Sequence, residues 1–244
     1  MTGQDLKNSI LQLAIQGKLV DQREEEGTAK DLIEEIRAEK ERLVKEKKIK
    51  KEKPLPEIEE DEIPFDIPET WEWVRLGEIL SVYGGKRIPA GRTLIDEDTG
   101  HRYIRVADMK NGSIDTSKMK YIPLDIYEKI KRYTISKNDV YITVAGTIGE
   151  AGIVPDELDN TNLTENANRL VVYANKKESI MHLLNSPFVQ FQISENTTKV
   201  GQPKLAIMRI RTLILPLPPL EEQKRIVEKI EELMPYVEEY GQVH

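Results

Sequence analysis

The chain has 244 residues, of which 39% are hydrophobic and 32% are charged, and its formal net charge is −7. It contains no cysteine, which excludes disulfides, thiolate nucleophiles and zinc sites with cysteine ligands. No signal peptide is visible, and no apolar run approaches the roughly 20 residues of a membrane span, so a cytoplasmic protein is expected.

The charge is distributed unevenly along the chain. Residues 1–70 hold 13 Lys+Arg and 19 Asp+Glu (−6), residues 71–215 hold 20 and 17 (+3), and residues 216–244 hold 3 and 7 (−4). Whether a protein can bind nucleic acid depends more on how its charge is distributed than on its net charge. A basic body between acidic ends therefore permits binding to nucleic acid without demonstrating it.

Residues 1–20 predict a helix that runs from Asp5 to Val20. Its apolar positions recur at spacings of 4, 3, 4 and 3, and they are Leu6, Ile10, Leu13, Gly17 and Val20. This spacing is typical of a helix that packs along another helix.

Residues 21–69 predict a charged helix followed by a linker. Thr28 is a candidate N-cap with Asp31 three residues later, and the helix is expected to extend to about Lys51. The lysine-rich run 45–53 could contact DNA phosphates, but a solvated helix end is the simpler interpretation because glutamates interrupt it. Four prolines between residues 54 and 69 exclude a helix or a paired strand there.

Residues 70–216 predict a globular body. The predicted strands are 103–106, 140–145 and 169–173, the predicted helices are 178–184 and 188–193, and Asn111-Gly112 predicts a tight turn. Strands and helices do not alternate regularly, which favours an α+β fold with a mixed sheet. Trp71 and Trp73 are expected to anchor its core.

Residues 217–244 predict a second long helix. The strand before it is expected to stop at Pro216, Pro218 and Pro219, since proline cannot donate to a sheet ladder. Its apolar seam consists of Ile226, Ile230, Leu233, Val237 and Tyr240. Long helices with matching seams at both ends predict a coiled-coil-like rod, formed within one molecule or between two. Pro235 should kink it.

The sequence contains no credible catalytic constellation. The glycine-rich stretch 146–152 lacks the Gly-Lys-Ser/Thr ending of a phosphate loop, and the three histidines are scattered. Leu217 precedes Pro218-Pro219 where an adenine methyltransferase has Asn or Asp. We therefore expect a protein that is not an enzyme and has no cofactor or metal of its own.

Two loops are candidates for DNA contact. Residues 84–92 and 196–204 combine glycines with cationic or polar side chains. The candidate residues are Lys86, Arg87, Arg92, Lys199, Gln202 and Lys204. Arginine can pair with guanine edges and glutamine with adenine, whereas lysine neutralises phosphate. Either stretch could also be an ordinary solvated loop.

Several segments, in this order along the chain, resemble specificity (S) subunits of type I restriction-modification systems. Residues 67–79, Ile-Pro-Glu-Thr-Trp-Glu-Trp-Val-Arg-Leu-Gly-Glu-Ile, resemble the opening of a target-recognition domain. Residues 139–149 resemble its central strand and glycine turn. The junction between that domain and a conserved helix is similar to residues 215–227, Leu-Pro-Leu-Pro-Pro-Leu-Glu-Glu-Gln-Lys-Arg-Ile-Val. Residues 6–20 resemble the far end of such a conserved helix.

The resemblance implies that residues 70–216 recognise a DNA target and that residues 1–20 and 217–244 are conserved helices, joined to the body by residues 21–69. It also implies a modification (methyltransferase) subunit that brings S-adenosylmethionine and a restriction subunit that brings ATP-driven cleavage. S subunits carry two recognition domains, so this chain is expected to be part of a longer protein or a half-subunit. A half-subunit would dimerise through the terminal helices. The alternative is a coiled-coil adaptor with an unrelated head that does not bind DNA.

Overall fold

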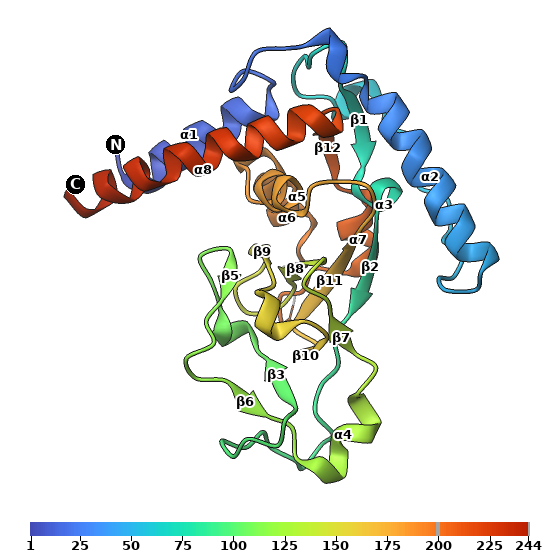
Figure 1. Cartoon of the computed structure of the whole chain (residues 1–244), viewed down its shortest axis with the longest axis vertical. Helices are drawn as coiled ribbons and strands as arrows, with labels where there is room; N and C mark the ends of the chain where they lie inside the picture. Colours follow the sequence, from blue (N-terminus) through green and yellow to red (C-terminus); the bar gives the residue numbers. More distant parts are fainter. Residues whose placement is uncertain (199–200, 244) are drawn as a thin grey trace. The chain divides into compact units, whose positions relative to one another are not determined.

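The computed structural model describes residues 1–198 and 201–243 (Figure 1). Its contacts divide the chain into two compact units. The helical unit comprises Met1–Leu80, Tyr173–Gln192 and Arg211–His244, and the sheet unit comprises Ser81–Val172 and Ile193–Ile210. The predicted body 70–216 thus contributes to both units, and its role as the recognition domain stays a prediction.

Two terminal helices lie side by side and antiparallel in the helical unit, α1 (Gly3–Ile15) and α8 (Leu220–Val243) (Figure 1). Near the chain termini they are so close that a Cβ on Gly3 would lie 2.9 Å from Gly241 Cα. Their shared cluster of buried residues is Ile10, Leu11, Ala14, Trp71, Ile226, Ile230 and Val237. The predicted pairing of the terminal helices is therefore present within one molecule.

The seam of α1 differs from the prediction in detail. Leu13 is 43% exposed, whereas Leu11 is 1% exposed. The predicted spacing assumes a single partner helix, but α1 also packs against α5 (Lys177–Leu184), which turns the buried face of α1 away from Leu13.

α1 also ends earlier than predicted, because Gly17 is not a seam position but a helix terminator. Its φ is +66°, its N–H donates to the Ala14 carbonyl at 3.2 Å, and the Lys18 N–H donates to the Leu13 carbonyl at 2.9 Å. These two bonds form a Schellman motif, which closes the helix.

We expect Gly17→Ala to lower the free energy of unfolding by about 3 kcal/mol, because an alanine there is strained and its Cβ would overlap the Pro68 ring. Gly91→Ala is the matched control, since Gly91 also has a positive φ, in a turn closed by the Arg92 N–H to the Pro89 carbonyl, and a Cβ there meets nothing within 4 Å. The control should cost about 1 kcal/mol. Urea denaturation of both variants checks this, and equal costs would contradict the close approach to Pro68.

The second helix, α2 (Ala29–Lys45), begins as predicted and ends sooner. Thr28 and Asp31 form the capping box, with Thr28 N–H to Asp31 Oδ2 at 3.1 Å. The helix stops before Lys51 because Lys47 adopts a φ of +58° and the Lys48 N–H returns to the Leu43 carbonyl.

The proline-rich linker contains a single 3-10 turn, Glu60–Glu62, as its only regular element among the described residues. It is fixed by Arg75, which is 6% exposed. The Arg75 guanidinium donates to the carbonyls of Pro56 (3.2 Å) and Glu57 (2.8 Å) and forms an ion pair with Glu62 at 2.6 Å. The linker is thus ordered against the body.

β1 (Glu72–Arg75) pairs antiparallel with β12 (Ile214–Leu217), so β12 continues through Pro216. The strand ends at Leu217, directly before Pro218 and Pro219 as predicted, but Pro216 lies inside it and does not stop it. One side of each strand in a two-stranded sheet has no partner strand, so a residue without an N–H is tolerated there.

Both tryptophans anchor the helical unit, as predicted. Trp71 is 3% exposed and its Nε1 donates to Glu222 Oε2 at 2.8 Å. The Trp73 ring lies 5.2 Å from Phe65 and 5.7 Å from Phe188, centroid to centroid. Phe188 lies on α6 (Pro187–Asn196), which starts at the proline that separates it from α5. In the chain, α3 (Leu76–Ile79) follows β1 directly, and α7 (Ile207–Thr212) precedes β12.

The sheet unit contains two four-stranded sheets and one hairpin. The first sheet has the order β6 (Lys120–Tyr121), β3 (Arg102–Ile104), β10 (Thr161–Leu163) and β7 (Thr134–Ile135). The second has the order β2 (Leu80–Gly84), β11 (Ala167–Val172), β8 (Val140–Thr143) and β9 (Ala151–Ile153). The helix α4 spans Leu124–Ile130.

The first sheet is mixed, since β10 runs parallel to β3 and antiparallel to β7. The hairpin joins β4 (Met109–Lys110) to β5 (Ser113–Ile114) through Asn111 and Gly112, both with positive φ. This confirms the predicted turn, because a type I′ turn requires positive φ at both positions. The predicted α+β class is confirmed.

Candidate nucleic-acid interface

The first candidate loop, residues 84–92, is anchored on the connection between β10 and β11. Gly85 N–H donates to the Ala167 carbonyl at 3.2 Å and Lys86 N–H donates to the Leu163 carbonyl at 2.9 Å. A Cβ on Gly85 would lie 2.6 Å from the Thr164 carbonyl carbon, so only glycine permits this approach. The loop is fixed at its base while Lys86 and Arg87 are exposed.

The second candidate loop closes on itself at its base. Thr198 N–H donates to the Lys204 carbonyl at 3.3 Å, and Lys204 N–H donates to Thr198 Oγ1 at 3.1 Å. Leu205 N–H then donates to the Val144 carbonyl at 3.0 Å. Gln202 and Lys204 are exposed, whereas Lys199 lies outside the described residues.

The structure brings the two loops to one end of the β8–β11 pair. The Asn166 carbonyl accepts from the N–H groups of Val144 (2.8 Å) and Ala145 (3.3 Å). The connection 163–167 also anchors the first loop, and Val144 anchors the second. Hydrogen bonds therefore join two loops that are more than a hundred residues apart in sequence.

Next to the first loop is a group of cations and tyrosines. The Lys86 ammonium lies 5.5 Å from the centroid of the Tyr133 ring, and the Arg132 guanidinium lies 5.1 Å from the same centroid. Arg132 also donates to Tyr133 Oη at 3.0 Å, and this hydrogen bond lowers the pKa of Tyr133. The guanidinium of Arg169 lies 5.1 Å from the centroid of the Tyr83 ring.

Arg169 links the two rings, because it also donates to the Thr134 carbonyl at 2.8 Å, next to Tyr133. We call Lys86, Arg87, Arg132 and Arg169 the basic cluster. Cation–π contacts hold charged side chains over tyrosine faces while leaving their charges available to an anion.

Two of the predicted arginines are paired with carboxylates. Arg87, whose side chain is 75% exposed, lies 2.5 Å from Glu165 Oε1. Burial alone would raise the pKa of Glu165, but hydrogen bonds from Arg87, from the backbone and from Thr164 lower that pKa on balance. Arg92 forms two hydrogen bonds with Asp125, one of them at 2.6 Å. Both guanidinium groups are thus fixed and partly neutralised.

Sequence reasoning missed Arg132 and Arg169. Neither lies in a glycine-rich loop, and the fold alone brings them to Lys86. The run Lys131-Arg132-Tyr133, which combines cations with an aromatic ring, is the signal that could have marked this position.

Other chemistry is not apparent in the part of the chain that the structure describes. Across residues 1–198 and 201–243, no three His, Asp or Glu side chains are grouped so that they could hold a metal ion. Over the same residues, no helix is both long and apolar enough to cross a bilayer.

Comparison with known proteins places these features in context. Residues 68–237 match the family model of the type I restriction modification DNA specificity domain. The EcoAI type I restriction enzyme specificity subunit of Escherichia coli is 32% identical over 234 residues, which is 94% of this chain and 39% of that relative. The EcoBI specificity subunit of the same organism is 29% identical and covers 74% of this chain and 38% of its own. The chain thus spans well under half the length of these relatives.

Solved structures share the fold. A chain from a structure of a type I R-M system has a TM-score of 0.58 at 21% identity, covering 88% of this chain and 51% of that one. The HsdS subunit from Thermoanaerobacter tengcongensis has a TM-score of 0.53 at 21% identity, covering 74% of this chain and 41% of its own. The match of 68–237 includes most of the sheet unit, so an unrelated globular head is not supported.

Proposed function

The chain belongs to the type I restriction-modification DNA specificity family, and on that premise we propose that its sheet unit reads a DNA target for a modification and restriction complex. The observation that carries the proposal is the convergence of both candidate loops and the basic cluster at one end of the β8–β11 pair. The protein itself performs no catalysis in this proposal, and a modification subunit and a restriction subunit supply the chemistry.

The residues divide into two roles. Lys86, Arg132 and Lys204 neutralise phosphates, because ammonium and guanidinium groups release counterions from the duplex. Arg87 and Gln202, on the two loops, present side chains that can form paired hydrogen bonds to guanine and adenine edges. Arg92, and Lys199 outside the described residues, are the remaining candidates for DNA contact.

The terminal helices provide the surface for the modification subunit in this proposal. Ile10, Ile226 and Ile230 fill the contact between α1 and α8 and are not available to a partner. Leu6 and Leu233 pack at its edge. Leu13 is 43% exposed and Tyr236 is 65% exposed, so these two side chains are the better candidates for contact with another subunit.

A homodimer through the terminal helices also stays a prediction. The seams that would form it are already filled within one chain, so a second chain could occupy them only by exchanging a helix. Light scattering at tens of micromolar, on the order of ordinary self-association affinities, distinguishes the two states. A dimer would place two recognition domains in two-fold relation and favour a palindromic target.

DNA binding by the purified chain, measured by fluorescence anisotropy over a range of salt concentrations, tests the proposal. We expect the logarithm of affinity to fall linearly with the logarithm of salt concentration, by about 0.9 for each phosphate neutralised. Binding that is absent at low salt, or that does not depend on salt, would contradict the proposal.

Glu165→Gln should raise the affinity for DNA by about threefold to tenfold at low salt, because it removes a carboxylate that both neutralises Arg87 and repels phosphates. Glu157→Gln makes the same chemical change at an exposed position of the sheet unit outside the basic cluster. It should leave the affinity within about twofold. Equal effects of the two substitutions in the same titration would show that Glu165 has no special place at the interface.

A further inference from the structure

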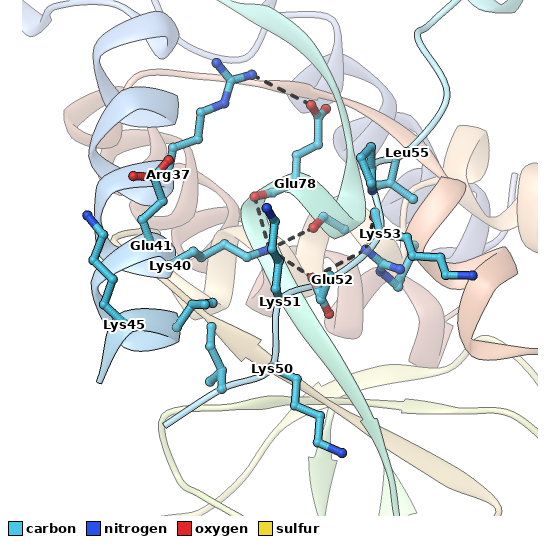
Figure 2. A pocket seen from close by; sticks show the side chains of 15 residues that line it. Arg37, Lys40, Glu41, Lys45, Lys50, Lys51, Glu52, Lys53, Leu55 and Glu78 are labelled. Atoms are coloured by element: carbon cyan, nitrogen blue, oxygen red, sulfur yellow. Dashed lines mark hydrogen bonds and ion pairs between the residues drawn. The ribbon is translucent and has the colours of Figure 1, made fainter. Parts of the chain in front are cut away.

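The helical unit contains a cavity of about 560 Å³ that the proposed DNA interface does not use (Figure 2). One wall is the C-terminal half of α2, from Arg37 to Lys45, and the opposite wall is the segment from Ile49 to Leu55 that follows the end of this helix. Gly77, Glu78 and Arg211 complete the lining.

In the inner part of the cavity, the charged side chains are paired with one another. The Lys40 ammonium donates to the carbonyls of Gly77 (2.9 Å) and Leu80 (3.1 Å) at the end of α3. It also donates to Glu52 Oε2 at 3.3 Å (Figure 2). Burial lowers the pKa of Lys40. Arg211 reaches the same Glu52 oxygen at 3.4 Å, so this carboxylate already has two cationic partners.

The rim carries an excess of positive charge. Lys45 on α2 and Lys50, Lys51 and Lys53 on the facing segment are all exposed and line the cavity (Figure 2). Within residues 1–198 and 201–243, none of the four ammonium groups forms an ion pair with a carboxylate. Glu41 is also exposed in the lining, so four lysines face one such carboxylate, and the net positive charge favours an anionic occupant.

The lining between these lysines is apolar. Val44, Ile49 and Leu55 are each half-buried and contribute side chains to the cavity from both of its walls. A DNA duplex would satisfy the lysines, but its bases are stacked in its interior, so it has no projecting apolar group to place between these side chains. A peptide that carries carboxylates on both sides of one aliphatic or aromatic residue would satisfy both features.

We propose that this cavity is a docking site for an acidic segment of a partner protein, with one apolar side chain placed between Val44, Ile49 and Leu55 and its carboxylates on the rim lysines. The charge complementarity and the apolar lining carry this assignment, and it does not depend on the proposed DNA function.

A random dodecapeptide library displayed on phage and selected on the purified chain tests the proposal. Selection uses the unsubstituted chain alone, and an enriched peptide is then synthesised with a fluorescein label for anisotropy. The matched control is Lys47→Gln/Lys48→Gln, which removes two charges from the turn directly before this segment, outside the cavity lining, where Lys48 pairs with Glu46 at 2.7 Å.

We expect enriched peptides with Asp or Glu around a Leu, Ile or Phe. Lys50→Gln/Lys51→Gln should weaken their binding about tenfold, and the control should change it less than about twofold. Leu55→Ser should also weaken binding, whereas charge attraction alone predicts no effect of this change.

Enriched peptides without an acidic pattern, no enrichment at all, or equal effects of both lysine pairs would overturn the proposal. A duplex of unrelated sequence that loses affinity with Lys50→Gln/Lys51→Gln, while no acidic peptide binds, would assign the cavity to nucleic acid instead. Thermal melts of all variants confirm that each is folded.

Discussion

Replacing Lys86, Arg87 and Arg132 together with glutamine should weaken duplex DNA binding about 100-fold near 0.1 M salt and lower the salt slope by about 2 to 3. All three side chains are exposed, and Lys86 and Arg132 contact the same tyrosine ring. Lys86 and Arg132 each neutralise one phosphate in this proposal, so their loss removes two counterion-release steps, and the lost charge of Arg87 at the base edges adds at most one more. Anisotropy titrations at several salt concentrations yield both quantities.

The control for this experiment removes the same charge from positions outside the basic cluster, one of them on the opposite edge of the first sheet. Lys120 lies in β6, whereas Thr134, which follows Tyr133, lies in β7 at the other end of the order β6-β3-β10-β7. Lys110 and Lys118 precede β6 in the chain. Glutamine at Lys110, Lys118 and Lys120 should leave the slope nearly unchanged. Equal slopes for the two triple variants would show that the basic cluster is not the DNA-binding face.

The second large effect concerns acid stability and His182 on α5. Burial, with a smaller contribution from the Lys7 charge on α1, lowers the pKa of this imidazole to about 4. An unfolded histidine titrates near 6.5. Between these two pKa values, His182 binds a proton in the unfolded chain but not in the folded one. Its contribution to the free energy of unfolding is therefore highest above pH ~6.5 and is lost as the pH falls toward the folded pKa. The loss attributable to His182 should be about 2 kcal/mol between pH 7.5 and pH 5.

His182→Gln should remove that part of the pH dependence. Urea denaturation at both pH values, followed by tryptophan fluorescence, measures it, because Trp71 and Trp73 both lie in the helical unit. The imidazole faces a small cavity that Leu11, Ala14 and Ile226 also line, so protonation would place a charge in the packing between α1, α5 and α8. An unchanged difference between pH 7.5 and pH 5 in the variant would contradict the assignment.

Local signals in the sequence predicted the beginnings of elements well. Thr28 and Asp31 form the capping box that their spacing predicts, and Asn111-Gly112 forms the predicted turn. Trp71 anchors the core as expected. These features depend on residues that are close in sequence, where side-chain hydrogen bonds and backbone conformation decide the outcome.

The features that sequence reasoning missed depend on contacts between distant residues. The spacing of Leu13 fits the seam of a helix pair, but α5 is a third partner and turns that side chain outward. β12 passes through Pro216 because, among the described residues, β1 is its only partner strand. Arg169 reaches the Lys86 region through Thr134, a contact that no local pattern shows.

The candidate site could be predicted in part. Both loops were identified from their glycines and cations, and the hydrogen bonds of Asn166 and Val144 place them together. The pairing of Arg87 with Glu165 and of Arg92 with Asp125 was not foreseeable, because each carboxylate is at least thirty residues from its arginine in sequence.

The central proposal is that the sheet unit recognises a DNA sequence. The most direct test is to let the purified chain select from DNA duplexes whose central positions are randomised. The proposal predicts that sequencing of the retained duplexes recovers a short motif. The triple variant at Lys86, Arg87 and Arg132 should lose that motif, whereas the variant at Lys110, Lys118 and Lys120 should keep it. Retention of duplexes with no enriched motif, or the same motif recovered by both variants, would contradict the proposal.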